Sequence, residues 1–243
     1  MFYKIILSFI IFPSFFPIWA EKPTFQYLGK AYDLNTGKYL YSDNHLEFFA
    51  NGKHLYSEIT YKDSNGNLFA KKHIEYDKNP LVPTFNTEDF RDGYLEGADV
   101  KGKQVRLFYK RKKEDAIEEK TYTPLYPAVM DGGFDHFVRE YWDRLVQGER
   151  MSFRFLAPVQ LDDYSFAVEK IKDEDWKGRK AVYVKLEIDN FILKRLIRPI
   201  LLVYDYKTKR ILQYEGISNI NDENGKSLKV KIVYDYPKEI LAD

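Results

Sequence analysis

One segment of this chain has the periodicity of an amphipathic helix, whereas the rest consists of short runs of strand-forming residues. Its apolar side chains recur every three or four positions and would form one stripe of an α-helix: Phe134, Phe137, Val138, Tyr141, Trp142, Leu145 and Val146. Asp131 is placed to cap the start of this helix, and Gly148 is placed to end it. The pattern predicts one helix near residues 133–147 whose apolar face must be covered.

The strand-forming runs are rich in aromatic residues, because Tyr contributes 20 residues and Phe contributes 18. Such side chains suit a pleated, half-buried surface. We predict strands at residues 39–50, 54–61, 68–76, 104–112, 151–157, 164–171, 181–189, 201–206, 211–220 and 228–236. The Asn-Gly pairs at 51–52 and 65–66 favour tight hairpins, since Asn and Gly tolerate a positive φ. The strands are therefore expected to form an antiparallel meander.

The single helix and the sheet are expected to cover each other. A helix with a broad apolar stripe is stable only against another apolar surface, and the sheet offers the one surface of sufficient size. The sequence thus predicts a mainly β fold of the α+β type. We expect one domain, residues 21–243, in which a strongly curved antiparallel sheet or half-barrel wraps around the amphipathic helix.

Residues 1–20 have the features of a cleavable export signal. Lys4 supplies a positive charge, residues 5–12 form an apolar run, and Ala20 is a small residue at the expected cleavage site. The apolar run is much shorter than the roughly 20 residues of a spanning helix. We therefore expect an exported protein with no transmembrane segment after signal cleavage. In a Gram-negative bacterium it would be periplasmic, and otherwise it would be secreted.

The expected mature chain has no net charge and no cysteine. Removal of residues 1–20 takes Lys4 from the 38 basic residues and leaves 37, which equals the 37 acidic residues. This balance provides no long-range field for nucleic acid, so no nucleic-acid partner is expected. The lack of cysteine excludes disulfides, thiolate catalysis and a lipidated cysteine anchor. No cofactor is expected, and the oligomeric state is left open.

A row of His and Glu residues on the N-terminal strands is the strongest candidate for chemistry. If both Asn-Gly pairs form two-residue turns, His45 faces Glu58 and Glu58 faces His73, with Leu46 and Phe48 on the opposite, core-forming face. Neighbouring strands lie about 4.8 Å apart, so two imidazoles beside a carboxylate could hold a divalent cation such as zinc. The alternative is a solvent-exposed sheet face, and a shift of one residue would separate the three side chains.

The function that the pattern favours is binding rather than catalysis, since no catalytic signature is present. An apolar cleft beside the helix would accept a lipid, an acyl chain or another hydrophobic or amphipathic ligand. The expected contact residues are Phe137, Tyr141, Trp142, Phe153, Phe155 and Phe166. Two alternatives stay open, namely a metal-dependent envelope enzyme that uses the His/Glu row and a ligand-free structural interaction protein.

Two stretches resemble a family of uncharacterised exported bacterial β-rich proteins. The first is GFDHFVREYW at residues 133–142, followed by Leu145, Gly148 and Phe153, and the second is GISN at residues 216–219. The resemblance implies an exported β-rich protein with no assigned activity, so it assigns no functional residue. More remotely, the expected architecture is similar to the periplasmic lipoprotein-carrier fold, which holds acyl chains between a curved sheet and a helix.

Overall fold

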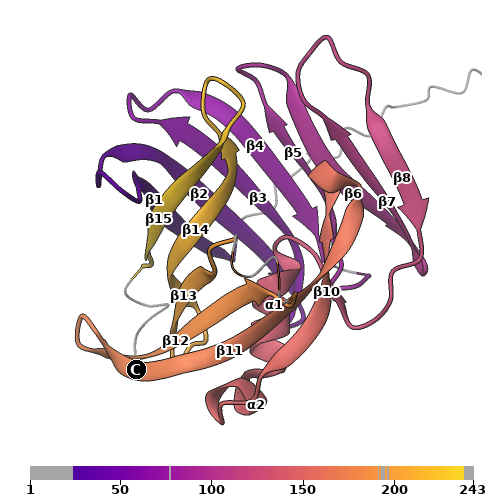
Figure 1. The fold of residues 1–243 in the computed structure, drawn as a ribbon. Helices are drawn as coiled ribbons and strands as arrows, with labels where there is room; N and C mark the ends of the chain where they lie inside the picture. Colours follow the sequence, from indigo (N-terminus) through magenta and orange to yellow (C-terminus); the bar gives the residue numbers. More distant parts are fainter. Residues whose placement is uncertain (1–23, 77, 191, 193–194, 196, 238–243) are drawn as a thin grey trace, which may run out of the picture.

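All 15 strands of the computed structural model, which describes residues 24–76, 78–190, 192, 195 and 197–237, belong to one sheet (Figure 1). The predicted export signal lies outside the described residues. The N-terminal strands are β1 (Phe25–Asp33), β2 (Tyr39–Ala50), β3 (Lys53–Asp63), β4 (Leu68–Glu75), β5 (Thr84–Asp89), β6 (Tyr94–Lys101), β7 (Gln104–Lys110) and β8 (Glu118–Tyr122). The C-terminal strands are β9 (Ala128–Val129), β10 (Met151–Ala157), β11 (Asp162–Trp176), β12 (Arg179–Ile188), β13 (Ile200–Asp205), β14 (Ile211–Asn221) and β15 (Ser227–Asp235).

The sheet consists of two meanders joined at its centre. Strands β1 to β8 follow one another across one half, and β10 to β15 do the same across the other half. The two halves meet where β1 pairs antiparallel with β15. All these pairs are antiparallel, and only the short strand β9 pairs parallel, with β10. The predicted antiparallel meander is therefore present twice, and the predicted mainly β, strongly curved sheet is confirmed.

The helical segment is present within the curve of the sheet (Figure 1). It is divided at Tyr141 into α1 (Gly133–Glu140) and α2 (Trp142–Val146). Its apolar face packs on the C-terminal half of the sheet in one buried cluster of Phe134, Phe137, Val138, Trp142, Leu145, Met151, Phe153, Val168, Val184, Leu202 and Tyr204. Hydrogen bonds add to this contact: Tyr204 Oη donates to Asp135 Oδ1 at 2.8 Å, and Lys170 Nζ on β11 donates to the carbonyl oxygen of Val146 at 2.6 Å. The sheet thus covers the apolar stripe, as the sequence predicts.

The expected cap of the helix differs in the structure. Gly132 is the N-cap residue of α1, and no side chain caps it. Asp131 instead directs its carboxylate to Lys72 on β4, with Nζ and Oδ2 2.6 Å apart. The carboxylate was expected to bind the first amide groups of the helix, but Oδ2 accepts from this lysine and Oδ1 accepts from the amide of Gly132, just before the helix, at 2.7 Å. Gly148, which has a φ of +87°, follows the end of α2 as predicted.

The register of the first hairpin corrects one sequence prediction. Asn51 and Gly52 both have a positive φ, as a type I′ turn requires, but a β-bulge at Leu55 adds one residue to β3. Beyond this bulge His45 pairs with Ile59, so the prediction that His45 faces Glu58 is wrong. The prediction that Glu58 faces His73 is confirmed.

The bulge places the polar side chains of β2 inside the molecule. Asp43, His45 and Glu47 line the concave side, where the sequence analysis expected Leu46 and Phe48. Phe48 instead stacks on Tyr56, with ring centroids 4.2 Å apart. A one-residue shift in a strand reverses the face of each following side chain. The interior therefore carries charged groups that the sequence pattern assigns to the surface.

The sheet does not close into a complete barrel. Its edges are β8 and β9, which are not paired with each other. The short 3-10 helix Pro158–Gln160 lies against β6 and β7 near this gap, and Lys120 bonds Asp162 across it with Nζ and Oδ1 3.0 Å apart. These contacts hold the two edges near each other. No helix in the described ranges is long and apolar enough to cross a membrane.

Candidate functional site

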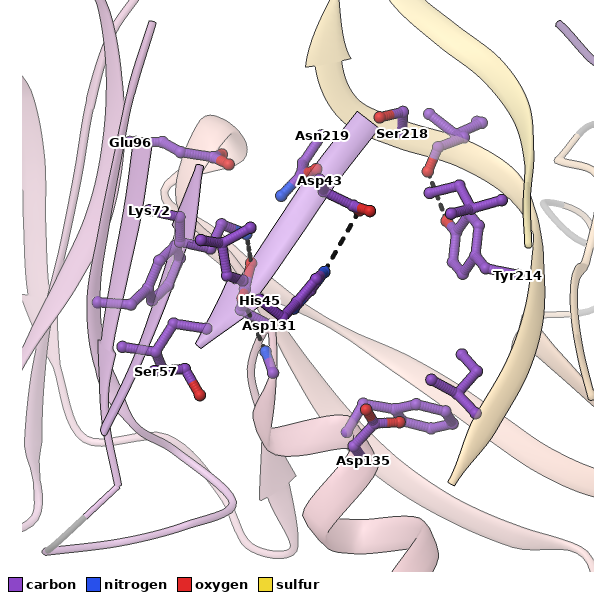
Figure 2. A pocket seen from close by; sticks show the side chains of 18 of the residues that line it. Asp43, His45, Ser57, Lys72, Glu96, Asp131, Asp135, Tyr214, Ser218 and Asn219 are labelled. Atoms are coloured by element: carbon purple, nitrogen blue, oxygen red, sulfur yellow. Dashed lines mark hydrogen bonds and ion pairs between the residues drawn. The ribbon is translucent and has the colours of Figure 1, made fainter. Parts of the chain in front are cut away.

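The concave side of the sheet encloses a cavity of about 540 Å³ (Figure 2). Side chains from both halves of the sheet and from residues 131–139 line it. Its volume lies within the range of about 300–1,000 Å³ that is usual for small-molecule sites. We therefore take this cavity as the candidate functional site.

The two walls of the cavity differ in charge. The N-terminal strands and the helical segment supply all of its ionisable acidic, basic and histidine side chains: Asp43, His45, Glu47, His54, Lys72, Glu96, Asp131, Asp135 and Arg139. The lining residues of β10 to β15 include none. Their apolar members are Phe155, Leu156, Ala157, Leu186, Ile200, Leu202, Ile211, Ile217 and Ile232, and their polar members are uncharged at neutral pH: Tyr204, Tyr214, Ser218, Asn219, Asn221, Ser227 and Tyr234. A charged wall therefore faces an uncharged wall, here called the apolar wall, across the same space.

Two ion pairs neutralise part of the charged wall. Lys72 bonds Asp131, and the lysine side chain is only 4% exposed. Arg210, on the loop between β13 and β14, donates from Nη1 to Glu47 Oε2 at 2.6 Å and so connects the two halves. Burial favours the neutral form of Glu47, but the adjacent Arg210 guanidinium holds the pKa of this carboxyl below its usual value. The Glu47–Arg210 pair therefore stays charged although it is buried.

Glu96 on β6 is a buried carboxyl whose pKa is raised, in contrast to that of Glu47. Burial raises the pKa of Glu96 from 4.5 to about 7, and the nearby charge of Lys72 opposes this rise. The side chain lines the cavity beside Lys72 (Figure 2). Near neutral pH this carboxyl is therefore divided between its protonated and ionised forms.

We expect Glu96→Gln to change the dependence of stability on pH. A raised pKa means that the folded protein binds this proton more tightly than the unfolded chain, so the contribution to stability is present below about pH 4.5 and is lost as pH rises through about 7. As the pH rises from 5 to 8, wild type loses this contribution whereas Glu96→Gln does not. The free energy of unfolding of Glu96→Gln should therefore rise by about 2 kcal/mol relative to that of wild type over this range. Urea denaturation at several pH values measures this gain. The same gain in Glu88→Gln, a control on the exposed face of β5, would contradict the assignment.

A chain of three side chains fixes α1 against β3. Ser57 Oγ lies 2.9 Å from His54 Nε2, and His54 Nδ1 lies 3.1 Å from His136 Nε2. Burial lowers the pKa of His54 to about 4 and that of His136 to about 3, so both imidazoles are neutral at pH 7. One ring nitrogen of a neutral imidazole donates and the other accepts. Because the hydroxyl is buried and both His54 nitrogens are bonded, the chain positions the helix.

Asp43 and His45 are the lining residues of the described part of the chain that each have a buried side-chain atom without a hydrogen bond. Within the described residues no group bonds Asp43 Oδ1 or His45 Nε2, although both atoms are buried. The shortest contact between the two side chains joins His45 Nε2 to Asp43 Oδ2 at 3.4 Å. This distance exceeds that of an ordinary hydrogen bond. Figure 2 shows the Asp43 carboxylate facing the His45 imidazole, and a dashed line marks this contact.

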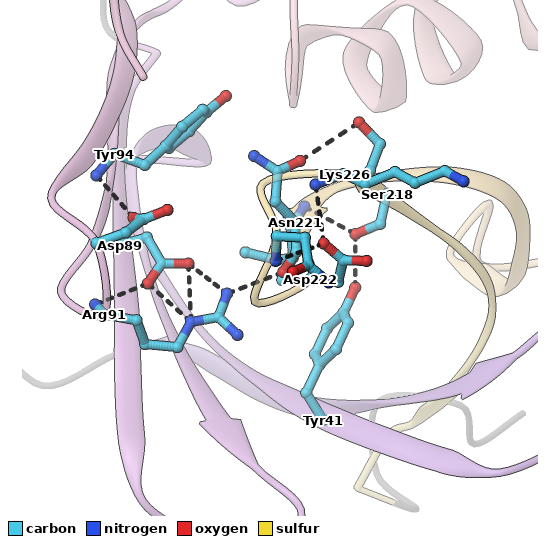
Figure 3. Close-up of polar contacts among 12 residues, drawn as sticks. Tyr41, Asp89, Arg91, Tyr94, Ser218, Asn221, Asp222 and Lys226 are labelled. Carbon is cyan, nitrogen blue, oxygen red and sulfur yellow. Dashed lines mark hydrogen bonds and ion pairs between the residues drawn. The ribbon is translucent and has the colours of Figure 1, made fainter. Parts of the chain in front are cut away.

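The β14–β15 hairpin covers one end of the cavity (Figure 3). Arg91, which also bonds Asp89, donates from Nη2 to the carbonyl oxygen of Asn221 at 3.0 Å. Below this contact the hydroxyls of Tyr41 and Ser218 are 2.8 Å apart. The hairpin of the C-terminal half is thus fastened to the N-terminal half, and it limits access from this end.

The predicted ligand contacts are only partly at the cavity. Phe155 lines it. Phe137, Trp142 and Phe153 are at most 4% exposed and, with Tyr141 and Phe166, belong to the core between helix and sheet. The structure therefore places these five side chains beneath the cavity wall, because the helix fills the space in which the sequence analysis expected a cleft. Ligand binding itself stays a prediction.

The predicted metal ligands are not brought together. His45 lies on the concave side, whereas Glu58 and His73 pair on the other face of their strands. No group of three or more His, Asp or Glu side chains in the described part of the chain is arranged to hold a metal ion. The bulge at Leu55 is the physical reason, since it reverses the face of β2 relative to the expected row.

The sequence analysis missed Asp43, Lys72, Glu96 and Asp135 as residues of the interior. Tyr41, Asp43, His45 and Glu47 do alternate along β2, which is a signal that they share one face. Polar alternation usually indicates the face in contact with water, and only the register shows that this face is the inner one.

Comparisons with known proteins identify a fold. No family model matches this chain, and no curated protein does. Among solved structures, the chain is similar to a β-barrel-like protein of the domain of unknown function DUF1849 from Brucella abortus. The TM-score is 0.51 with 7% sequence identity, and the match covers 89% of this chain and 98% of the other. The similarity supports the β-rich half-barrel fold, whereas the motif-based family and the carrier-like architecture stay predictions.

Proposed function

We propose that this protein is a non-catalytic binding module that holds an amphipathic ligand, such as a lipid or an acylated molecule, in its half-barrel. The separation of the cavity into a charged and an apolar wall carries the proposal. An apolar tail on the wall of β10 to β14 loses its contact with water, which favours binding by about 25 cal/mol per Å². A polar head then meets side chains that can pair with it.

Two further observations support this function. The cavity of about 540 Å³ provides space that a ligand-free, fully packed scaffold does not need. The β14–β15 hairpin covers one end and would exclude water from a bound tail. Export is part of the proposal, because a carrier of lipids between the membranes or outside the cell needs an export signal such as the one predicted at residues 1–20.

The test uses N-phenyl-1-naphthylamine, a neutral apolar probe whose fluorescence rises in apolar surroundings. We expect saturable binding by wild type. Ile200→Glu should weaken it at least about tenfold, since a carboxylate on the apolar wall costs the complex at least about 1.4 kcal/mol. Fluorescence titration gives the dissociation constants.

The matched control is Ile117→Glu, because Ile117 is 50% exposed and does not line the cavity. This variant should bind like wild type, and circular dichroism should show that both variants are folded. Absence of saturable binding by wild type, or equal binding by the two folded variants, would exclude the proposed function.

A further inference from the structure

We propose that the cavity selects amphipathic ligands whose head group is a positively charged amine or ammonium, and that Asp43 receives this head. The inference rests on the proposed function and names its ligand class. It is carried by a buried carboxylate that lacks a hydrogen bond, by the aromatic rings around it and by the pairing of the other charges.

The first observation is the state of the Asp43 carboxylate. Its side chain is 6% exposed, and its Oδ1 has no hydrogen-bond partner within the part of the chain that the structure describes. Gly29 on β1 makes room for it, because a Cβ at residue 29 would lie 1.8 Å from this oxygen. Asp43 Oδ2 lies 3.4 Å from His45 Nε2, so Oδ1 is the oxygen that remains for a ligand. A buried carboxylate oxygen without a partner is costly, so a protein that keeps one gains from a cation in the adjoining space.

The second observation is the aromatic environment of Asp43. A Cβ added to Gly29 would also lie 2.9 Å from Cε1 of Tyr234. The Tyr234 ring is therefore beside the Asp43 carboxylate. Burial, together with the charge of Asp43, raises the pKa of Tyr41, Tyr61 and Tyr234 well above the usual value. The three phenols are therefore neutral and near this charge.

The imidazole of His45 completes the aromatic surroundings. It stacks on Tyr27 with ring centroids 4.4 Å apart, and it meets Tyr234 at 5.9 Å. Faces of aromatic rings attract cations, and a carboxylate among such rings suits an amine or a quaternary ammonium group. An anionic head at this position would instead be repelled by Asp43.

The third observation is the distribution of the remaining charges. Lys72 is paired with Asp131, and Glu47 is paired with Arg210, so neither pair offers a free charge of one sign. Asp135 accepts a hydrogen bond from Tyr204. Arg139 is the one lining cation for which the described residues provide no ion pair, and it is half-buried on α1. Acidic side chains outnumber lysine and arginine side chains on the wall, and its two unbonded buried atoms within the described residues are a carboxylate oxygen of Asp43 and an imidazole nitrogen of His45.

The apolar wall lies opposite this site and gives the ligand its direction. Asp43 is on β2, whereas Ile200, Leu202 and Ile211 line the cavity from the C-terminal half. A cationic head at Asp43 therefore leaves an attached chain free to lie on these side chains. The two walls together select a molecule that has both parts.

The experiment measures displacement of N-phenyl-1-naphthylamine by three amphiphiles that share a dodecyl chain, each below its critical micelle concentration. These are dodecyltrimethylammonium, dodecanol and dodecyl sulfate, with a positive, a neutral and a negative head. We expect the ammonium compound to bind wild type at least about tenfold more tightly than either of the others. Asp43→Asn should remove this preference and leave the affinity for dodecanol unchanged.

Glu58→Gln is the matched control, because it removes an exposed carboxylate on the other face of β3 and should keep the preference. If Asp43→Asn does not fold, the order of affinities in wild type alone decides the question. Probe binding with no ammonium preference, a preference for dodecyl sulfate, or an unchanged preference in Asp43→Asn would overturn this inference while the proposed function stands. No probe binding at all would overturn both.

Discussion

Phe137→Ala is expected to lower the free energy of unfolding by about 3–5 kcal/mol. Phe137 is 2% exposed and lies at the centre of the contact between helix and sheet. Its ring centroid is 4.7 Å from that of Tyr141 and 4.8 Å from that of Phe153. Alanine would leave a large cavity there, because sheet residues on rigid strands cannot collapse into the space. Urea denaturation followed by circular dichroism measures the loss.

Phe90→Ala provides a control with the same chemical change. Phe90 follows β5 and is 47% exposed, so its truncation should cost less than about 1 kcal/mol. Similar losses in the two variants would mean that the helix is not embedded in the sheet. In that case the helix would not form part of the cavity lining, and the proposed site would have to be abandoned.

Arg210→Met should destabilise the protein by about 3–5 kcal/mol at neutral pH. The change leaves Glu47, whose side chain is 7% exposed, without its partner. Arg210 also lies over the ring of Phe25, 4.7 Å from its centroid, and this contact is lost as well. The pair joins residues 163 positions apart, so the variant also weakens the contact between the two halves of the sheet.

The effect of Arg210→Met should depend on pH in a defined direction. Since the folded-state pKa of Glu47 is lowered, the stability that it contributes is present above the ordinary pKa of 4.5 and is lost as pH falls through the folded-state value. The difference between wild type and variant should thus shrink in acid. Arg144→Met removes a pair whose side chains are 53% and 46% exposed, so it should change the stability far less than Arg210→Met at any pH. A loss as large as that of Arg210→Met would contradict this explanation.

The sequence predicts the architecture because its signals are local. The stripe from Phe134 to Val146 and the Asn51-Gly52 turn depend on neighbours within a few positions, and both are present in the structure. Although the helix is interrupted at Tyr141, the apolar residues of both parts still face the sheet. Local periodicity was therefore sufficient to predict a curved sheet around a helix.

The sequence analysis missed β1, β5, β6, β8 and β9, and two of these strands have acidic residues on their inner faces. Strand β5 buries Asp89 and β6 buries Glu96, so neither strand shows the usual alternation of apolar and polar residues. Such side chains are normally assigned to turns or to the surface. The interior charge that makes the cavity unusual is thus the same property that hides these strands.

The candidate site depends on register and on contacts between distant residues. One extra residue, Leu55, decides that His45 is inside and Glu58 is outside, and no turn motif marks this bulge. The pair of Glu47 with Arg210 and the contact of Asp43 with Gly29 arise only when strands align. Hydrophobic patterns do not determine such alignments, and this is why the predicted metal row was wrong and the charged wall was missed.

The two halves of the sheet are joined when β15, the last strand along the chain, pairs with β1 at the centre of the sheet. Leu28 aligns with Asp235 and Asp33 aligns with Val230, so residues about 200 positions apart must meet at the centre of the molecule. Such separations slow folding, since a long loop has to close before the contact forms. Until β15 has left the ribosome, β1 and β14 both present open edges. The half-barrel is thus a structure that the growing polypeptide completes only after β15 has been synthesised.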